Sequence, residues 1–287
     1  MKYQKNPQYQ EIELESISEF YEIIEEYNHY YHLPNENNYD PCLAFYRGQS
    51  NSGWNIEPSL SRKETPEFKA IKEFSQVEKK TSLFSTIAYL QHHQPGTRFI
   101  DFTTNPAVAL YFACCDNPEI SGAVYICQYL CHRAEWYTAT VLSELAALEV
   151  NDKIFVEFLA QKVLEKHPEY TGKFEDLNSL AGSIISFLDH GFMVLPDKQS
   201  LYENIRMQRQ EGSFYICGVQ FDKELKSCDR FFSRAGKQMF DPHSVVIPSL
   251  LKDAKGLVKL IIPAKLKEEI LAHLAAHKIT HDFLFPD

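Results

Sequence analysis

The sequence lacks the short motifs that mark the common nucleotide-binding and hydrolytic enzymes. It has no G-x-G-x-x-G and no G-x-x-x-x-G-K-[ST], so neither a Rossmann unit nor a P-loop is indicated. It also has no H-E-x-x-H and no G-x-S-x-G, the patterns of zinc proteases and of α/β hydrolases. No internal repeat or low-complexity tract is present. A function has to be argued from other residues.

Positive charge is scarce. The 29 Lys and Arg residues are outnumbered by 39 Asp and Glu, which gives a formal net charge of −10 at pH 7. Binding along DNA, RNA or an anionic membrane needs clustered basic side chains. The sequence therefore argues against a broad nucleic-acid or membrane surface, while a local basic pocket for one nucleotide stays open. A nuclease is disfavoured on the same ground and by the lack of a clear carboxylate cluster for a divalent metal.

Regular cysteine spacing and long hydrophobic runs are also missing. Cys127-x3-Cys131-His132 superficially suggests zinc, but no second ligand pair lies near it, so no metal is expected. The seven scattered cysteines fit free thiols in a reducing compartment. Residues 1–7 have no apolar signal-peptide core, and apolar runs such as 107–115 are too short to span a bilayer. We expect a soluble cytoplasmic protein with no membrane partner.

Apolar residues are plentiful, at 44% of the 287 positions, enough for a sizeable packed core. We expect an N-terminal amphipathic helix and linker over 1–40, and one domain over 41–287 with a helix-rich segment at about 131–195. Segregated strands and irregularly placed helices favour an α+β fold over alternating βαβ units. Hydrophobic spacing predicts helices over about 12–31, 66–89, 107–116, 138–188 (broken near 168–173) and 265–277, and strands over about 42–47, 99–102, 123–127, 213–219, 244–247 and 257–262.

The densest polar chemistry lies in residues 91–113. The pattern predicts a turn, a half-buried strand, a polar tip and the start of a helix. Asn105 is expected to cap that helix and Pro106 to occupy its first position. Backbone N–H groups and hydroxyls at such an entrance suit a phosphate. A well-capped surface helix is the commoner outcome, and the density of polar groups is what favours a site.

Three segments together resemble the FRG domain family, named after its aromatic-Arg-Gly tripeptide. The second of them matches the family pattern nearly position by position, and the third is weaker. The resemblance runs from about Phe45 to the last residue, with no distinctive motif between about 130 and 195. The segments are Phe45-Tyr46-Arg47-Gly48-Gln49 with Trp54 and 58–62; Leu90 to Ala113; and Asn204-x-Arg206 with 210–214 and Leu284-Phe285-Pro286-Asp287.

The order of these motifs also resembles that of ADP-ribosyltransferases, which implies a split β-sheet core with flanking helices and NAD as the substrate. By this resemblance Arg47, Thr103 and Glu211 are the catalytic residues. Cleavage of the nicotinamide–ribose bond develops positive charge on the ribose, and Glu211 would stabilise that charge. Arg47 would fork onto a phosphate or ribose oxygen. Thr103 would bond the ribose or support Glu211.

Several of the residues expected to bind NAD have a structural alternative. Arg47 could pair with Asp101, which could itself orient an arginine or close a turn. The histidines could cap carbonyls or pack. Gln210 and Glu211 are expected to alternate on one strand, so that only one of them faces the cleft. The predicted NAD-binding residues are Tyr46, Arg47, Gly48, His92, His93, Arg98, Asp101, Thr103 and Gln210.

Together these resemblances imply an enzyme that transfers ADP-ribose to an unknown macromolecular acceptor or hydrolyses NAD. Family context suggests a bacterial toxin or anti-phage defence effector, with an inhibitor or partner protein as a further expectation. The competing interpretation is a non-catalytic nucleotide-sensing or protein-interaction module. A nuclease is the third.

Overall fold

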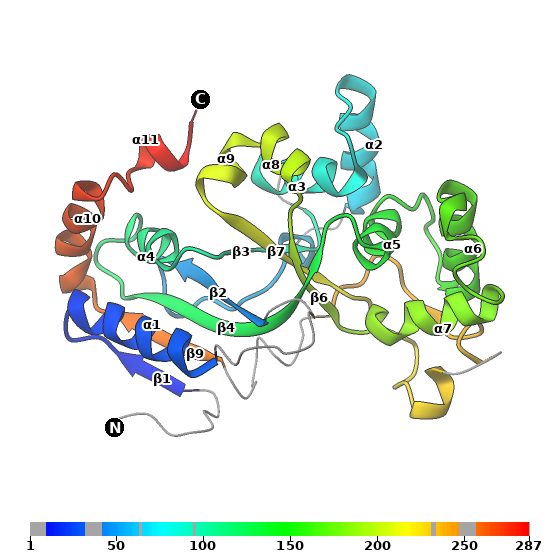
Figure 1. The fold of residues 1–287 in the computed structure, drawn as a ribbon, viewed down its shortest axis with the longest axis horizontal. Helices are drawn as coiled ribbons and strands as arrows, with labels where there is room; N and C mark the ends of the chain where they lie inside the picture. The colour runs from blue at the N-terminus through cyan, green and yellow to red at the C-terminus, as the bar shows by residue number, and fades with distance from the viewer. Residues whose placement is uncertain are drawn as a thin grey trace.

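The computed structural model describes residues 10–31, 42–62, 65–93, 96–230, 234–246 and 257–286. Helices surround one large sheet (Figure 1). The strands are β1 (Gln10–Glu13), β2 (Cys42–Gln49), β3 (Phe99–Thr103), β4 (Gly122–Arg133), β5 (Ile154–Phe155), β6 (Gly191–Leu195), β7 (Gly212–Cys217), β8 (Met239–Phe240) and β9 (Val258–Ile262). The α-helices are α1 (Ile17–Tyr31), α2 (Glu67–Val77), α3 (Leu83–His93), α4 (Pro106–Cys114), α5 (Tyr137–Ala146), α6 (Val156–Lys166), α7 (Leu177–Leu188), α8 (Lys198–Glu203), α9 (Ile205–Arg209), α10 (Lys267–Ala276) and α11 (His281–Leu284).

The main sheet has seven strands in the order β1-β9-β4-β2-β3-β7-β6. Most neighbours are antiparallel, whereas β1–β9 and β4–β6 are parallel. Strand β6, the last in this order, also pairs with the end of the 12-residue strand β4, where Cys131 lies opposite Met193. The sheet is therefore curled, and the expectation of a mixed helix and strand fold with flanking helices is confirmed.

The curl divides the core into an inner cluster and two outer ones. Alternate residues of the strands point inward, as the period of two requires, and include Phe45, Ile100 and Tyr215. Outside, one cluster joins α1, α4 and α10 to β4 and β9. The other packs α3, α5, α6 and α7 against β3, β6 and β7. In Figure 1, α1, α4 and α10 lie on the left and α5, α6 and α7 lie on the right.

Four predicted elements differ from the structure. The helix expected over about 12–31 begins only at Ile17, because residues 10–13 form β1. The helix expected over 66–89 is two helices, α2 and α3, because the chain leaves helical geometry after Val77. Only Val246 of the strand expected over 244–247 is described as paired, through a single bridge to Gly218, and Ile247 lies outside the described residues. The helical stretch over 138–188 has a second interruption, at 147–155, where β5 pairs with β8.

The first described residues belong to the main sheet. Strand β1 pairs with β9 from Gln10 to Glu13, and α1 buries Phe20 and Ile24 in the cluster shared with α4 and α10. The predicted division at residue 40 stays a prediction, and residues 32–40 of the expected linker lie outside the described residues. In the described part of the chain, no helix combines the length and the apolar character that crossing a membrane requires.

Candidate functional site

A pocket of about 190 Å³ opens where β2, β3 and β7 meet α3, α4 and α9. Its walls combine aromatic rings with four ionisable side chains: two arginines, one carboxylate and one imidazole. The lining residues come from all three sequence motifs. They are Tyr46, Arg47, Gly48, His92, Asp101, Phe102, Thr103, Val108, Phe112, Arg206, Gln210, Gly212 and Phe214.

The pocket lies where β2 and β3 separate. The pairing of these strands consists of one register pair, Tyr46 with Thr103, whereas β3 pairs with β7 along its whole length. Next to that pair, helix α4 packs closely on β2. A Cβ atom on Gly48 would lie 1.9 Å from the carbonyl oxygen of Ala109, so only glycine fits there. The backbone of α4 thus takes up the space beside the Gly48 Cα.

The start of α4 forms as the sequence predicted. Asn105 accepts hydrogen bonds from the N–H groups of Ala107 and Val108, and Pro106 is the first helical residue. Thr103 Oγ1 accepts from the Asn105 N–H at 3.0 Å and donates to the Gln210 carbonyl at 2.7 Å. The Thr103 hydroxyl is therefore committed to joining β3 to the end of α9.

Two arginines approach the pocket from different parts of the chain. Arg47 Nη1 donates to the Asp101 carbonyl at 2.7 Å, and Arg206 Nη1 donates to the His92 carbonyl at 3.3 Å. Burial lowers the pKa of both guanidinium groups, and the Asp101 carboxylate opposes that shift. Arginine stays protonated at neutral pH, so the pocket contains two cations and one anion.

Four polar side-chain atoms around this pocket are shielded from solvent and have no hydrogen-bond partner among the described residues. They are Arg47 Nε, His92 Nε2, Asp101 Oδ1 and Arg206 Nε. A buried polar group without a partner costs about 1–3 kcal/mol, and more when it is charged. Such groups are rare in native proteins, and their concentration in one pocket indicates a ligand that supplies the missing partners.

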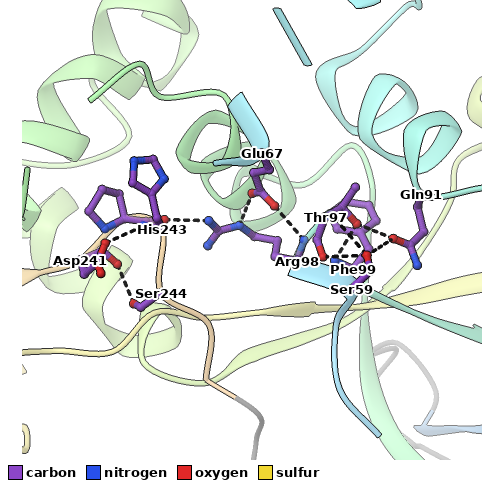
Figure 2. A network of polar contacts seen from close by, with 10 residues as sticks. Ser59, Glu67, Gln91, Thr97, Arg98, Phe99, Asp241, His243 and Ser244 are labelled. Carbon is purple, nitrogen blue, oxygen red and sulfur yellow. Dashed lines mark hydrogen bonds and ion pairs between the residues drawn. The ribbon is translucent and has the colours of Figure 1, made fainter. Parts of the chain in front are cut away.

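Asp101 is held by a chain of side-chain hydrogen bonds. Gln91 Nε2 donates to Asp101 Oδ2 at 2.8 Å, which leaves Oδ1 for the pocket. The orientation of the Gln91 amide is fixed from behind, because its Oε1 accepts from Thr97 Oγ1 at 2.5 Å and from Ser59 Oγ at 3.4 Å (Figure 2). Asp101 is thus oriented by residues near the start of β3 and does not form a side-chain ion pair with Arg47.

Burial lowers the pKa of His92 to about 4, with Asp101 acting in the opposite direction. His92 is therefore neutral at pH 7 and adds no charge to the pocket. Its ring lies 5.9 Å from that of Phe214, and one of its two nitrogens is the unpartnered Nε2. A neutral imidazole can offer that nitrogen as a donor or an acceptor, according to its tautomer.

The low pKa of His92 predicts a pH-dependent loss of stability. In the unfolded chain this histidine takes up a proton near pH 6.5, whereas the folded state resists protonation down to about pH 4. The unfolded state therefore binds more protons in that window, and stability falls as the pH falls through it. Between pH 7 and pH 4, we expect the free energy of unfolding to fall by about 3 kcal/mol less in His92→Gln than in the wild type. Urea unfolding at a series of pH values measures this.

His93→Gln is the control for that experiment. The His93 ring is exposed and stacks on Tyr89 at 4.2 Å, outside the pocket. Its substitution should change the pH profile much less. Equal pH profiles for the wild type and His92→Gln would contradict the assignment of the low pKa to this residue.

Arg98 lies outside the pocket. Its side chain is fully buried and forms an ion pair through Nε with Glu67, which is itself 2% exposed. Glu67 also accepts from the Arg98 backbone N–H at 2.7 Å, and Arg98 Nη2 donates to the Pro242 carbonyl at 2.8 Å (Figure 2). Arg98 thus connects the start of β3 to α2 and to the 241–244 turn.

The expected strand position of Gln210 and Glu211 is wrong. Gln210 ends α9, Glu211 has a φ of 46°, and β7 begins at Gly212. The two side chains therefore do not alternate across a sheet. Gln210 is buried, lines the pocket and donates through Nε2 to the Leu284 carbonyl at 3.0 Å. Glu211 accepts from Asn105 Nδ2 at 2.7 Å and is not among the pocket residues.

The structure thus brings seven of the predicted residues to one pocket and leaves three outside it. His93, Arg98 and Glu211 lie elsewhere, and their predicted roles stay predictions. Arg206 was not among the predicted site residues, although it belongs to the third family motif, which carried the signal. The seven are Tyr46, Arg47, Gly48, His92, Asp101, Thr103 and Gln210.

In the part of the chain that the structure describes, no group of three His, Cys, Asp or Glu side chains is placed to hold a metal ion. Comparison with curated proteins and with solved structures gave no significant match. The family model of the FRG domain matches residues 43–121, which include the first two motifs and run from β2 to the residue before β4. Over this segment the chain is similar to the FRG domain family.

Proposed function

We propose that this pocket binds NAD and that the protein is an ADP-ribosyltransferase-like enzyme, which transfers ADP-ribose to a macromolecular acceptor or hydrolyses NAD. The observation that carries the proposal is the set of unpartnered atoms of Arg47, His92, Asp101 and Arg206 around one cavity. The separation of β2 from β3 beside it supports a split β-sheet core. A toxin or defence role, with an inhibitor or partner protein, belongs to the same proposal through the family resemblance.

The charges of the pocket suit the ribose–phosphate part of NAD. Guanidinium groups form strong, often bidentate hydrogen bonds with phosphate oxygens, and Arg47 and Arg206 each have an unpartnered Nε. The Asp101 carboxylate is an acceptor for ribose hydroxyls. It also places negative charge where cleavage of the glycosidic bond develops positive charge on the ribose.

The size of the pocket limits which part of NAD enters it. At about 190 Å³ it is smaller than the roughly 300–1,000 Å³ of sites that enclose drug-sized ligands. We assign the nicotinamide–ribose end and the phosphate next to it to the pocket, with the ring against Tyr46 or Phe214 and the adenosine part outside. In this arrangement Asp101 takes the role that the sequence gave to Glu211.

Incubation of the purified protein with NAD tests the proposal. We expect nicotinamide release, measured by liquid chromatography, from the protein alone or with cell lysate as the source of an acceptor. Arg47→Gln should weaken NAD binding about 10- to 100-fold, since a hydrogen bond to a charged group contributes roughly 1.5–3 kcal/mol.

Arg209→Gln is the matched control, because Arg209 lies on the same helix as Arg206 but outside the pocket. It should leave NAD binding unchanged. If NAD binds and no nicotinamide appears under either condition, the pocket serves a sensing module and not an enzyme. Absence of NAD binding would refute both the NAD-using enzyme and the NAD-sensing module.

A further inference from the structure

Residues 280–286, which include α11, lie against one wall of the pocket. The segment begins at Thr280, whose hydroxyl accepts from the Phe283 N–H and caps α11. Leu284 is fully buried in the cluster shared with α4 and α10. This segment also carries the last part of the third family motif, for which the proposed function assigns no role.

Three residues of the α9 region bind the segment. Arg209 Nη1 donates to the Phe283 carbonyl at 3.1 Å, and Gln210 Nε2 donates to the Leu284 carbonyl at 3.0 Å. The guanidinium carbon of Arg206 lies 4.3 Å from the centroid of the Phe285 ring. Two of these three residues, Arg206 and Gln210, line the pocket.

Phe285 is itself held in place on two sides. Its ring stacks on His281 at 4.8 Å with an interplanar angle of 16°, and it meets Phe112 edge to face at 5.8 Å. Phe112 is also a pocket residue. The ring of Phe285 thus connects α4 to Arg206, and the face of an aromatic ring attracts a guanidinium group.

We propose that Phe285 is a positioning residue, which holds the Arg206 guanidinium toward the pocket and so determines how tightly an anionic ligand binds there. The hydrogen bonds of Arg206 alone do not fix its orientation, because Nη1 makes one long bond to the His92 carbonyl and Nε makes none among the described residues. The ring of Phe285 supplies the missing constraint. This inference rests on the ligand-binding role of the pocket, but its first measurement needs no ligand.

The chain offers a matched control one turn away. Arg209 lies over the ring of Phe283 at 5.5 Å, the same kind of contact, and Arg209 is not a pocket residue. Phe283→Leu therefore removes a comparable cation–π contact without touching the pocket. Phe285→Leu keeps most of the apolar volume but removes the aromatic face, whereas Phe285→Tyr keeps that face.

The first measurement is the hydrogen exchange of arginine Nε–H groups by NMR in the ligand-free protein. We expect Phe285→Leu to speed the exchange of Arg206 about two- to five-fold, the factor that corresponds to an exposed cation–π contact. Phe283→Leu should affect Arg209 and leave Arg206 unchanged. An Arg206 signal that exchanges equally fast in the wild type and in Phe285→Leu would overturn the inference.

The second measurement is calorimetric titration with inorganic pyrophosphate and, separately, with NAD. Phe285→Leu should raise the pyrophosphate Kd about two- to five-fold, while Phe285→Tyr and Phe283→Leu match the wild type. Equal affinities for Phe285→Leu and the wild type, or no pyrophosphate binding by the wild type, overturn the inference. If pyrophosphate binds in a Phe285-dependent way and NAD does not bind, only the proposed function fails.

Discussion

Asp101→Asn is expected to slow nicotinamide release about 10²- to 10³-fold, the effect of removing one well-placed electrostatic group. The substitution keeps the shape of the side chain and the hydrogen bond from Gln91, but it removes the negative charge beside the ribose. The same substitution also removes the electrostatic repulsion between the Asp101 carboxylate and an anionic ligand. Binding of ADP-ribose, measured by calorimetry, should therefore be unchanged or tighter while turnover falls.

Glu211→Gln is the control for that prediction, since it makes the same chemical change at a carboxylate outside the pocket. Its hydrogen bond from Asn105 can be retained by the amide oxygen of Gln. We expect nearly wild-type turnover. If Glu211→Gln abolishes nicotinamide release and Asp101→Asn does not, the catalytic carboxylate is the one that the sequence indicated, and our assignment of Asp101 is incorrect.

Glu67→Gln is expected to lower the free energy of unfolding by about 3–5 kcal/mol, because it leaves a buried guanidinium without its counter-charge. Arg98 is fully buried, and Glu67 accepts from both its side chain and its backbone N–H. Figure 2 shows that the same arginine reaches the Pro242 carbonyl, so three separate segments depend on this pair. Urea unfolding followed by far-UV circular dichroism measures the loss.

The exposed pair of Lys72 and Glu149 is the matched control. Its atoms lie 2.6 Å apart, but the two side chains are 53% and 54% exposed, so Glu149→Gln should cost about 0–1 kcal/mol. The double variant Glu67→Leu/Arg98→Met should recover part of the stability lost by Glu67→Gln, because an apolar pair leaves no buried charge. A loss below about 1 kcal/mol for Glu67→Gln would show that the buried pair does not hold these segments together.

The extent to which the sequence predicted the site depended on how local each interaction was. Asn105 and Pro106 start α4 as expected, because the cap bonds reach only two and three residues along the chain. The placement of Gln210 and Glu211 on a strand failed because α9 ends at that point and Glu211 adopts a left-handed conformation. The residue types of Gln210 and Glu211 do not predict that the chain turns at this point.

By itself the sequence determined the character of the individual segments: the strand and capped helix of 91–113, the Arg-Gly pair at 47–48, and the match of residues 43–121 to the FRG domain. These features depend on neighbours along the chain. Only the tertiary structure decided which charges share a pocket, because the partners of a buried charge come from segments up to about half the chain length away. The order β2-β3-β7 brought Arg206 to Asp101 and Arg47, and the packing of α2 on β3 committed Arg98 to Glu67.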